Sequence, residues 1–404
     1  MPLLTSLLIL IVAARLLGQI FQRYGQPSIV GEMLAGVLLG PSALNLIHAN
    51  AALASISEFA VFLVVLSAGL EMNFKDVFNA LFSRGIVIAI LGFVLPFAAG
   101  AAVGAAFQLD VMRTVFLGLC VSITALPVTV RILQSFNLLN SDIARYSVAT
   151  AIFNDVAALL VLGVILNLPE QPSLRAIAVS VFGTGWKLVA LGALILGFNW
   201  QLEQLPKRGI HIEKVSEKLV EIVGGEALFG ILALFVLGFG SISEMLGFHF
   251  VIGAFFGALL IDRKFFLASR YHELDLTLRS LTEGFLGPVF FAYLGLEFDI
   301  DALRPLGFVF VVLAISIVSK VLAGWLGGLI IQLPQAEALG IGIILNGRGV
   351  MELVIASIAY ERGFINQGLF STLVLMGVVT TMITPLLFRR WILPNIEKES
   401  APSP

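Results

Sequence analysis

The chain has 404 residues, of which 59% are hydrophobic and only 12% are charged, with a formal net charge of −2. Soluble domains are about one-quarter charged, so this composition indicates a protein whose surroundings are mainly lipid. The slightly negative charge disfavours nucleic-acid binding, and we expect no nucleic-acid partner. The single cysteine, Cys120, excludes an internal disulfide, and its apolar neighbours favour a packing role.

Motifs typical of enzymes are absent from the sequence: it has no Walker loop, Cys-x-x-Cys, His-Glu-x-x-His or Gly-x-Ser-x-Gly pattern. Transport driven by nucleotide hydrolysis is therefore not encoded. We expect no enzyme activity, no cofactor and no nucleotide-binding domain. The first apolar run carries Arg15 and leads directly into a second run, which does not fit a cleavable signal peptide.

Apolar runs follow one another along the whole chain. A helix needs about 20 residues to cross a hydrocarbon core about 30 Å thick. Thirteen runs meet this requirement, and the sequence therefore predicts an all-α integral membrane protein with its termini on opposite sides. The predicted spans are 2–22, 27–45, 55–73, 85–107, 111–134, 142–167, 177–201, 220–243, 246–262, 278–298, 303–331, 336–359 and 368–391.

Basic residues concentrate in every second loop between the predicted spans, and loops rich in basic residues are typical of the cytoplasmic side. The loops of the other set are nearly bare: 46–54 has no basic residue, 168–176 has only Arg175, and 299–305 has only Arg304. We therefore expect an external N-terminus and a cytoplasmic C-terminus in a bacterial inner membrane or its equivalent. The basic set comprises Arg23, Lys75, Arg84, Arg131, Arg145, Lys207, Arg208, Lys214, Lys218, Arg263, Lys264, Arg270, Arg279, Arg389 and Arg390.

Two halves of the chain resemble each other weakly at an offset of 226 residues, where 67–73 aligns with 293–299 and 137–140 with 363–366. Matching spans then run in opposite directions, and such an inverted repeat is typical of alternating-access transporters. The sequence predicts a first half at 1–202, an amphipathic cytoplasmic linker at 203–219, a second half at 220–392 and a short cytoplasmic tail at 393–404.

An Asn154-Asp155 pair falls in the middle of the sixth predicted span. A charged residue at a helix centre costs about 2.5–3.5 kcal/mol on insertion scales, which favours a functional role. A carboxylate is a hard oxygen ligand for Na⁺ or K⁺, and burial disfavours its charged form, so a proton can compete with the cation. A purely structural Asp, paired with backbone or a basic residue, is the alternative.

The fifth predicted span contains Pro127, which interrupts helical hydrogen bonding and predicts a break or kink. Freed carbonyls and the hydroxyls of Ser122, Thr124 and Thr129 are candidate oxygen ligands for a cation. The hydroxyls alone are weak evidence, because kinked helices with Ser and Thr are common in membranes.

The twelfth predicted span contains Gly347-Arg348-Gly349, which indicates an unwound segment. We expect Arg348 to offset negative helix ends, with Glu352 one turn further on as its partner. A structural salt bridge explains this pair equally well. Lys320 stands alone in the eleventh span, where an ammonium needs a partner or loses its proton.

These motifs together resemble the second family of the monovalent cation:proton antiporter superfamily over residues 5–392. The matching stretches are 122–133, 153–158 and 346–353, in the same order and in the corresponding spans. The similarity is greatest to its cation/proton exchanger branch, with the membrane domain of Kef-type potassium-efflux proteins as a second match.

The resemblance implies a sodium/proton-antiporter-like fold with two discontinuous helices that cross near the ion site, and a homodimer that works by elevator motion. It also implies that Asp155 and Thr124 contact the ion, with Asn154 and Ser122 beside them. Lys320 takes the basic position of the eleventh span. Lipid and a second copy of the chain are the expected partners.

Two departures from the family pattern affect the mechanism. Electrogenic members carry two adjacent acids, whereas Asn154 takes the first position here, which favours electroneutral exchange. Electroneutral members of the sister family often have Glu four residues before the Asn, where this chain has Thr150, so the partner of Lys320 stays open. The leading hypothesis is K⁺/H⁺ or Na⁺/H⁺ antiport. A channel-like efflux pore and a transport-inactive membrane sensor are the alternatives.

Overall fold

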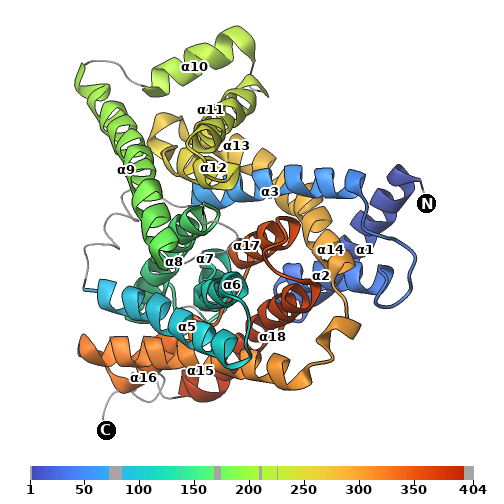
Figure 1. Cartoon of the computed structure of the whole chain (residues 1–404). Helices are drawn as coiled ribbons and strands as arrows, with labels where there is room; N and C mark the ends of the chain where they lie inside the picture. Colours follow the sequence, from blue (N-terminus) through green and yellow to red (C-terminus); the bar gives the residue numbers. More distant parts are fainter. Residues whose placement is uncertain are drawn as a thin grey trace. The chain divides into compact units, whose positions relative to one another are not determined.

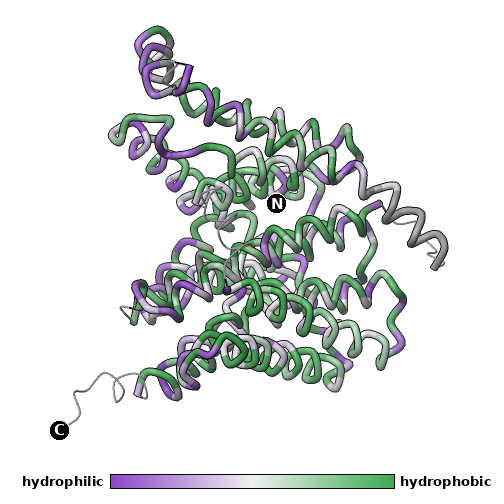
Figure 2. Tube along the Cα trace, turned by 90° about the vertical axis from the view of Figure 1, so that its left-hand side faces the viewer, coloured by the Kyte–Doolittle hydropathy of each residue, from purple (hydrophilic) through white to green (hydrophobic). Residues whose placement is uncertain are grey.

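A computed structural model describes residues 2–71, 84–136, 138–167, 174–208, 212–224 and 226–394. Every regular element in this part of the chain is helical, which confirms the predicted all-α class. Predicted features at Asn73, Lys75 and Asn137, and in the tail beyond residue 394, lie outside the described residues. Figure 2 shows hydrophobic residues along most of the helix lengths, with hydrophilic residues gathered mainly at helix ends.

The chain divides into two compact units. Unit 1 comprises Met1–Ile56, Val77–Ala158 and Pro288–Pro404, and unit 2 comprises Ser57–Asp76 and Leu159–Gly287. Each unit draws segments from both sides of the predicted 203–219 linker. Within that linker, a 3-10 turn covers Pro206–Arg208, and α10 (Ile212–Val223) begins after a gap in the described residues.

Unit 1 contains most of the helices that concern the candidate site, and Figure 1 labels them. They are α1 (Leu3–Arg23), α2 (Ser28–Leu39), α5 (Ile86–Ala106), α6 (Val111–Ser122), α7 (Leu126–Ser135), α8 (Asp142–Ile165, up to Ala158), α14 (Gly287–Glu297), α15 (Leu306–Ile330), α16 (Gln335–Ile344), α17 (Val350–Glu361) and α18 (Gln367–Trp391). A short 3-10 turn, Asp301–Leu303, lies between α14 and α15.

Unit 2 takes the remaining helices. They are α3 (Ala51–Glu71, from Ser57), α9 (Leu174–Gln204), α10, α11 (Glu226–Met245), α12 (Phe250–Leu259), a 3-10 turn (Arg263–Phe265), α13 (Ala268–Leu281) and a π-helical turn (Thr282–Leu286).

Eight helices in the described residues are long and apolar enough to cross a membrane: Leu3–Arg23, Ala51–Leu70, Ile86–Ala106, Asp142–Ile165, Gly185–Arg208, Leu228–Met245, Leu306–Ile330 and Gln367–Trp391. Four shorter apolar helices accompany them: Ser28–Leu39, Val111–Ser122, Phe250–Leu259 and Gln335–Ile344. Each predicted span overlaps at least one helix, but four spans are divided. The predicted spans 111–134 and 336–359 each contain two helices, 220–243 contains the end of α10 and most of α11, and 278–298 includes a π-helical turn.

Small residues bring the helices around the candidate site close together. In unit 1, α5 packs beside α6 and α15 beside α16 (Figure 1). A Cβ atom added to Gly100 would lie 2.9 Å from the Cα of Gly118, and one added to Gly324 would meet the backbone of Gly342. Because apolar side chains gain little by leaving lipid for a protein contact, such close backbone packing is a main source of helix association in membranes.

Candidate functional site

The helix of the fifth predicted span is interrupted directly before Pro127. Helix α6 ends at Ser122, the backbone is extended at Ile123 and Ala125, and α7 begins at Leu126. Pro127 lies in the first turn of α7, where a missing N–H leaves no helical hydrogen bond unmade. The interruption therefore lies just before the proline rather than within a bent helix.

A second interruption separates α16 from α17, where residues 345–349 are not helical. The two interruptions contact each other directly. The Ala125 N–H donates to the Gly347 carbonyl at 2.9 Å, and the Thr124 hydroxyl donates to the Leu345 carbonyl at 2.8 Å. A Cβ atom added to Gly349 would lie 2.8 Å from the Ala125 Cβ, so glycine permits this close approach.

Lys320 extends from α15 to the first interruption and is completely buried. Its ammonium donates to the Gly92 carbonyl at 3.0 Å, to the Thr124 hydroxyl at 2.7 Å and to the Ser122 carbonyl. An ammonium has three N–H donors, so these acceptors satisfy all of them. The sequence leaves the partner of Lys320 open, and the structure shows that its partners are neutral oxygens.

The Gly92 carbonyl is available to Lys320 because of a proline in α5. In an α-helix the carbonyl of residue 92 accepts the N–H of residue 96, and Pro96 has none. Our sequence reasoning missed Gly92. The sequence signal for this acceptor is the proline inside an otherwise uninterrupted apolar run, because it frees the carbonyl four residues earlier. A lone lysine in another span is a candidate donor for such a carbonyl.

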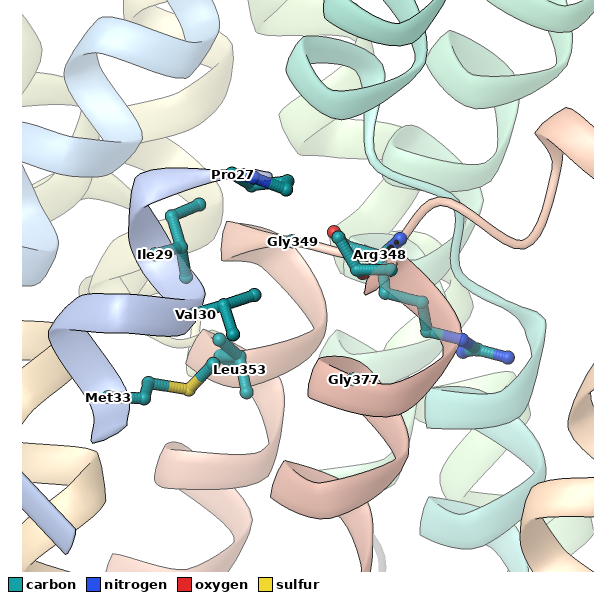
Figure 3. A pocket seen from close by; sticks show the side chains of 9 residues that line it. Pro27, Ile29, Val30, Met33, Arg348, Gly349, Leu353 and Gly377 are labelled. Carbon is teal, nitrogen blue, oxygen red and sulfur yellow. Dashed lines mark hydrogen bonds between the residues drawn. The ribbon is translucent and has the colours of Figure 1, made fainter. Parts of the chain in front are cut away.

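Arg348 lies in the second interruption, and its guanidinium reaches the end of α6. It donates to the Val121 carbonyl at 2.8 Å and to the Cys120 carbonyl, as part of a fully buried side chain. Figure 3 shows this side chain extending away from Val30 and Met33 of α2, which line a small pocket on the other side of the Arg348 backbone. The contacts place positive charge on the negative end of a helix, as the sequence predicts.

Backbone groups of Arg348 are held by a residue that sequence reasoning did not single out. The Thr381 hydroxyl on α18 accepts the Arg348 N–H and donates to the Arg348 carbonyl, at 3.0 Å in both cases. Thr381 is buried, but the many Ser and Thr residues in the apolar runs gave no reason to select it.

Glu352 is one turn from Arg348 on the same side and is fully buried. Its Oε2 lies 3.6 Å from a terminal nitrogen of Arg348, an ion pair without a hydrogen bond. The guanidinium donates instead to the α6 carbonyls. Glu352 also lies in the first turn of α17, where a carboxylate is favoured by the positive helix end.

Asn154 and Asp155 lie on α8, the helix of the sixth predicted span, and Asn154 joins this helix to the first interruption. The Asn154 amide donates to the Ser122 carbonyl and to the Thr124 hydroxyl, at 3.3 Å in both cases. The Asn154 Oδ1 and the Asp155 Oδ1 are buried and have no hydrogen-bond partner in the described part of the chain. Asp155 is 1% exposed.

Lys320 forms no salt bridge with Asp155 in the described residues, because each of its hydrogen bonds goes to a neutral oxygen. The carboxylate oxygen Oδ1 is thus left for another partner, which is the chemical feature expected of an ion or proton site.

Ser122 contributes differently from the sequence-based expectation. Its carbonyl is part of the cluster, but its hydroxyl donates to the Leu119 carbonyl of its own helix at 2.7 Å. Among the residues predicted for the site, hydrogen bonds join Ser122, Thr124, Asn154 and Lys320 as one group, and Asp155 follows Asn154 in α8. Gly347, Arg348 and Gly349 lie in the second interruption, which contacts the first, and Glu352 lies in the first turn of α17.

A sequence profile described as "Sodium/hydrogen exchanger, transmembrane" matches residues 7–391. The chain therefore belongs to the sodium/hydrogen exchanger family. This finding confirms the resemblance drawn from the three motifs and the prediction of a multi-pass membrane protein.

Individual relatives agree with this assignment. The chain is 30% identical to "Cation/H(+) antiporter 20" of Arabidopsis thaliana, with 95% of this chain and 48% of that protein covered. It therefore spans about half the length of this plant relative. The "Na(+)/H(+) antiporter" of Enterococcus hirae is 26% identical, with 95% and 96% covered. The "Na(+)/H(+)-K(+) antiporter GerN" of Bacillus cereus is 24% identical, with 94% of each chain covered.

The fold is also similar to a solved structure. The sodium proton antiporter MjNhaP1 from Methanocaldococcus jannaschii superposes with a TM-score of 0.64 over 97% of both chains, at 18% sequence identity. A second structure of the same protein gives a TM-score of 0.68. At this level of identity the comparison establishes a shared fold.

Proposed function

We propose that this protein is a secondary antiporter that exchanges a monovalent cation, Na⁺ or K⁺, for protons. The observation that carries the proposal is the buried Asp155 carboxyl, which has an unpartnered oxygen and follows Asn154, the residue whose amide bonds to the first interruption. The relatives named as Na⁺/H⁺, Na⁺/H⁺–K⁺ and cation/H⁺ antiporters support it. Their names include both ions, so the choice between Na⁺ and K⁺ is left to experiment.

In this proposal Asp155 holds either the cation or the proton. Thr124 joins the cation site when its hydroxyl releases one of the two hydrogen bonds that it accepts from Lys320 and Asn154. A buried carboxylate without a hydrogen bond is costly, so it favours whichever positive partner is available. Because the cation and the proton compete for one carboxyl, the cation flux and the proton flux are coupled. Lys320 and Arg348 hold the end of α6 in place during this exchange and do not bind the ion.

Exchange is electroneutral in this proposal, because one acid carries one positive charge in each direction. Asn154 supports this stoichiometry, since its amide donates two hydrogen bonds and adds no charge. Lys320 supports it too, because its ammonium is satisfied by neutral oxygens.

Several features of the wider architecture belong to the same proposal. They are thirteen passes in two inverted halves, two crossing interrupted helices, an external N-terminus, a cytoplasmic C-terminus and a homodimer with elevator motion. The Ala125–Gly347 hydrogen bond supports the crossing, because it joins the two interruptions directly.

The test is cation-evoked proton flux in liposomes that contain purified protein and a pH-sensitive dye. A proton gradient is imposed, and Na⁺, K⁺, Li⁺ or Rb⁺ is added, with and without a voltage clamp set by an ionophore. We expect saturable flux with one or more cations, no dependence on voltage, and loss of flux in Asp155→Asn. Asp301→Asn is the matched control, because this carboxylate is exposed on a short turn.

The alternatives give different results in the same assay. A channel-like pore would conduct the cation without stoichiometric proton movement and would respond to voltage. A membrane sensor would give no flux with any cation although the protein is folded. Either result would contradict the antiport proposal.

A further inference from the structure

One threonine of α18 forms different hydrogen bonds from the other buried threonines of that helix. Thr372, Thr380 and Thr384 each donate to the carbonyl four residues earlier at 2.7 Å. This bond within the helix is the usual solution for Thr in apolar surroundings. Thr381 is also buried, but its hydroxyl donates to the Arg348 carbonyl and accepts from the Arg348 N–H, at 3.0 Å in both cases. Thr381 therefore joins α18 to the second interruption.

The backbone on either side of Arg348 is glycine. A Cβ atom added to Gly349 would lie 2.8 Å from the Ala125 Cβ, and one added to Gly347 would lie 3.2 Å from a Val128 methyl group. The close approach of the two interruptions thus favours glycine at both positions. Glycine also leaves the backbone more conformational freedom than other residues do. The position of Arg348 must therefore be fixed by contacts with other segments.

Helix α2 gives the Arg348 backbone little support. A small cavity of about 10 Å³ lies between them, and its lining includes Val30 and Met33 on one side and Arg348 and Gly349 on the other (Figure 3). Residues that line a cavity make fewer van der Waals contacts than residues in a close-packed interior. The hydrogen bonds of Thr381 supply the fixing contacts instead, from the α18 side.

Arg348 connects Thr381 to the candidate ion site. Its guanidinium donates to the Val121 carbonyl in the last turn of α6 at 2.8 Å. Thr124 lies three residues further along the chain, and its hydroxyl donates to the Leu345 carbonyl of the second interruption at 2.8 Å. Because Thr124 is tied both to α6 and to the second interruption, a shift of the Arg348 backbone displaces the Thr124 oxygen.

A cation and a proton depend on this geometry to different degrees. A cation needs several oxygen ligands at fixed distances from its centre, whereas a proton needs a single carboxyl oxygen. Displacement of an oxygen near Asp155 therefore weakens cation binding and leaves proton binding nearly unchanged.

We propose that Thr381 is a positioning residue for cation binding. Its hydroxyl fixes the Arg348 backbone, and through Arg348 it keeps the Thr124 oxygen within reach of a cation held by Asp155. The proposal rests on the antiport function proposed above and adds a determinant of the cation affinity to it. Loss of the hydroxyl weakens the affinity for the cation and not the affinity for the proton.

The test measures cation-evoked proton flux in proteoliposomes against cation concentration at a series of pH values. When a cation and a proton compete for one carboxyl, the apparent cation KM is constant at alkaline pH and rises once the carboxyl binds protons. The alkaline plateau reports the cation affinity, and the pH of the bend reports the proton affinity. Thr381→Val removes the hydroxyl. Thr380→Val is the matched control, because the Thr380 hydroxyl bonds within its own helix.

We expect Thr381→Val to raise the plateau KM about tenfold, or about 1.4 kcal/mol of cation binding, with the bend at the wild-type pH. Thr381→Ser keeps the hydroxyl and should restore the wild-type plateau. Thr380→Val should match wild type in both quantities. Thr381→Cys introduces a weaker hydrogen-bonding group and should raise the plateau about threefold. The cysteine variant decides the question if thermal unfolding in detergent shows that the valine variant is not folded.

Three results would overturn the proposal. The first is an unchanged plateau in Thr381→Val or, if that variant is not folded, in Thr381→Cys, whatever the maximal rate, because Thr381 would then only support the fold. The second is a bend that moves together with the plateau, which would place the effect on the Asp155 carboxyl itself. The third is a Thr381→Ser variant as impaired as Thr381→Val. Failure of the antiport proposal looks different, since wild-type protein would then show no cation-evoked proton flux.

Discussion

The two interrupted helices end in different ways. At the end of α6, the carbonyls of Cys120, Val121 and Ser122 accept from buried cations, the first two from Arg348 and the third from Lys320. At the end of α16, the carbonyls of residues 342–345 accept from neutral donors, supplied by the Asn346 amide, the Gly347 N–H and the Thr124 hydroxyl.

This difference shows how charge is distributed around the candidate site. Both helix ends carry partial negative charge from unpaired carbonyls. The α6 end is compensated by full charges from two other segments, so it is fixed by long-range ion–dipole contacts. At the α16 end, most of the carbonyls accept hydrogen bonds from residues that directly follow the helix, and one accepts from a hydroxyl. We therefore expect substitutions at the α6 end to be more damaging than those at the α16 end.

The largest effect is expected from Arg348→Leu. This change leaves the Cys120 and Val121 carbonyls and the Glu352 carboxylate buried without their positive partner. Breaking a buried charge pair from one side costs about 3–5 kcal/mol. The loss is measured as the free energy of unfolding in detergent with a denaturant. Arg348→Lys should restore only part of it, because an ammonium cannot reproduce the planar two-carbonyl contact. A loss below about 1 kcal/mol for Arg348→Leu would contradict this account.

Lys320→Met is expected to have the next largest effect. It removes the donor from the Gly92 and Ser122 carbonyls and from the Thr124 hydroxyl, while nearly preserving side-chain volume. We expect a loss of about 2–3 kcal/mol, because unsatisfied buried acceptors cost about 1–3 kcal/mol. The same unfolding measurement applies. Equal or greater stability in Lys320→Met would show that the ammonium does not hold this helix end.

Asn346→Leu tests the neutral end of α16. The Asn346 amide donates to the Gly342 and Ile343 carbonyls at 3.1 and 3.3 Å. Removing these neutral hydrogen bonds should cost about 1–2 kcal/mol, which is less than either substitution at the α6 end. If Asn346→Leu proves as destabilising as Arg348→Leu, the contrast between the two helix ends is wrong.

The smallest effect tests the origin of the Gly92 acceptor. Pro96→Ala supplies an N–H that can bond the Gly92 carbonyl within α5. In this background Lys320→Met should cost about 1 kcal/mol less than in wild type, because one of its three acceptors has a new donor. A double-mutant cycle on unfolding free energies measures this coupling. Strict additivity would indicate that Pro96 does not determine the contact.

The helices and the segments of the site were predictable from the sequence because lipid imposes a length and an apolar composition on each span. Asp155, Lys320 and Arg348 stand out for the same reason, since charge is costly there. Glu352 was predicted as the ion-pair partner of Arg348, but the carbonyls to which the two cations donate were not predictable. Backbone carbonyls carry no sequence signature, and the short helix breaks at residues 123–125 and 345–349 depend on contacts between distant segments.

The Thr150 position shows a different limit of sequence reasoning. A comparison of motifs identifies it as a departure from the sister family and leaves Lys320 without an acid. The structure shows that Lys320 needs none, because proline-freed and helix-end carbonyls take that place. The number and placement of such carbonyls follow from three-dimensional packing, which residue spacing does not encode.

The most direct test of the central claim is the dependence of the apparent cation KM on pH in proteoliposomes. If the cation and the proton compete for Asp155, KM should rise by about tenfold for each unit of falling pH on the acid side, while the maximal rate stays constant. A KM that does not change with pH, or cation-evoked proton flux that persists in Asp155→Asn, would contradict a shared site at this carboxyl.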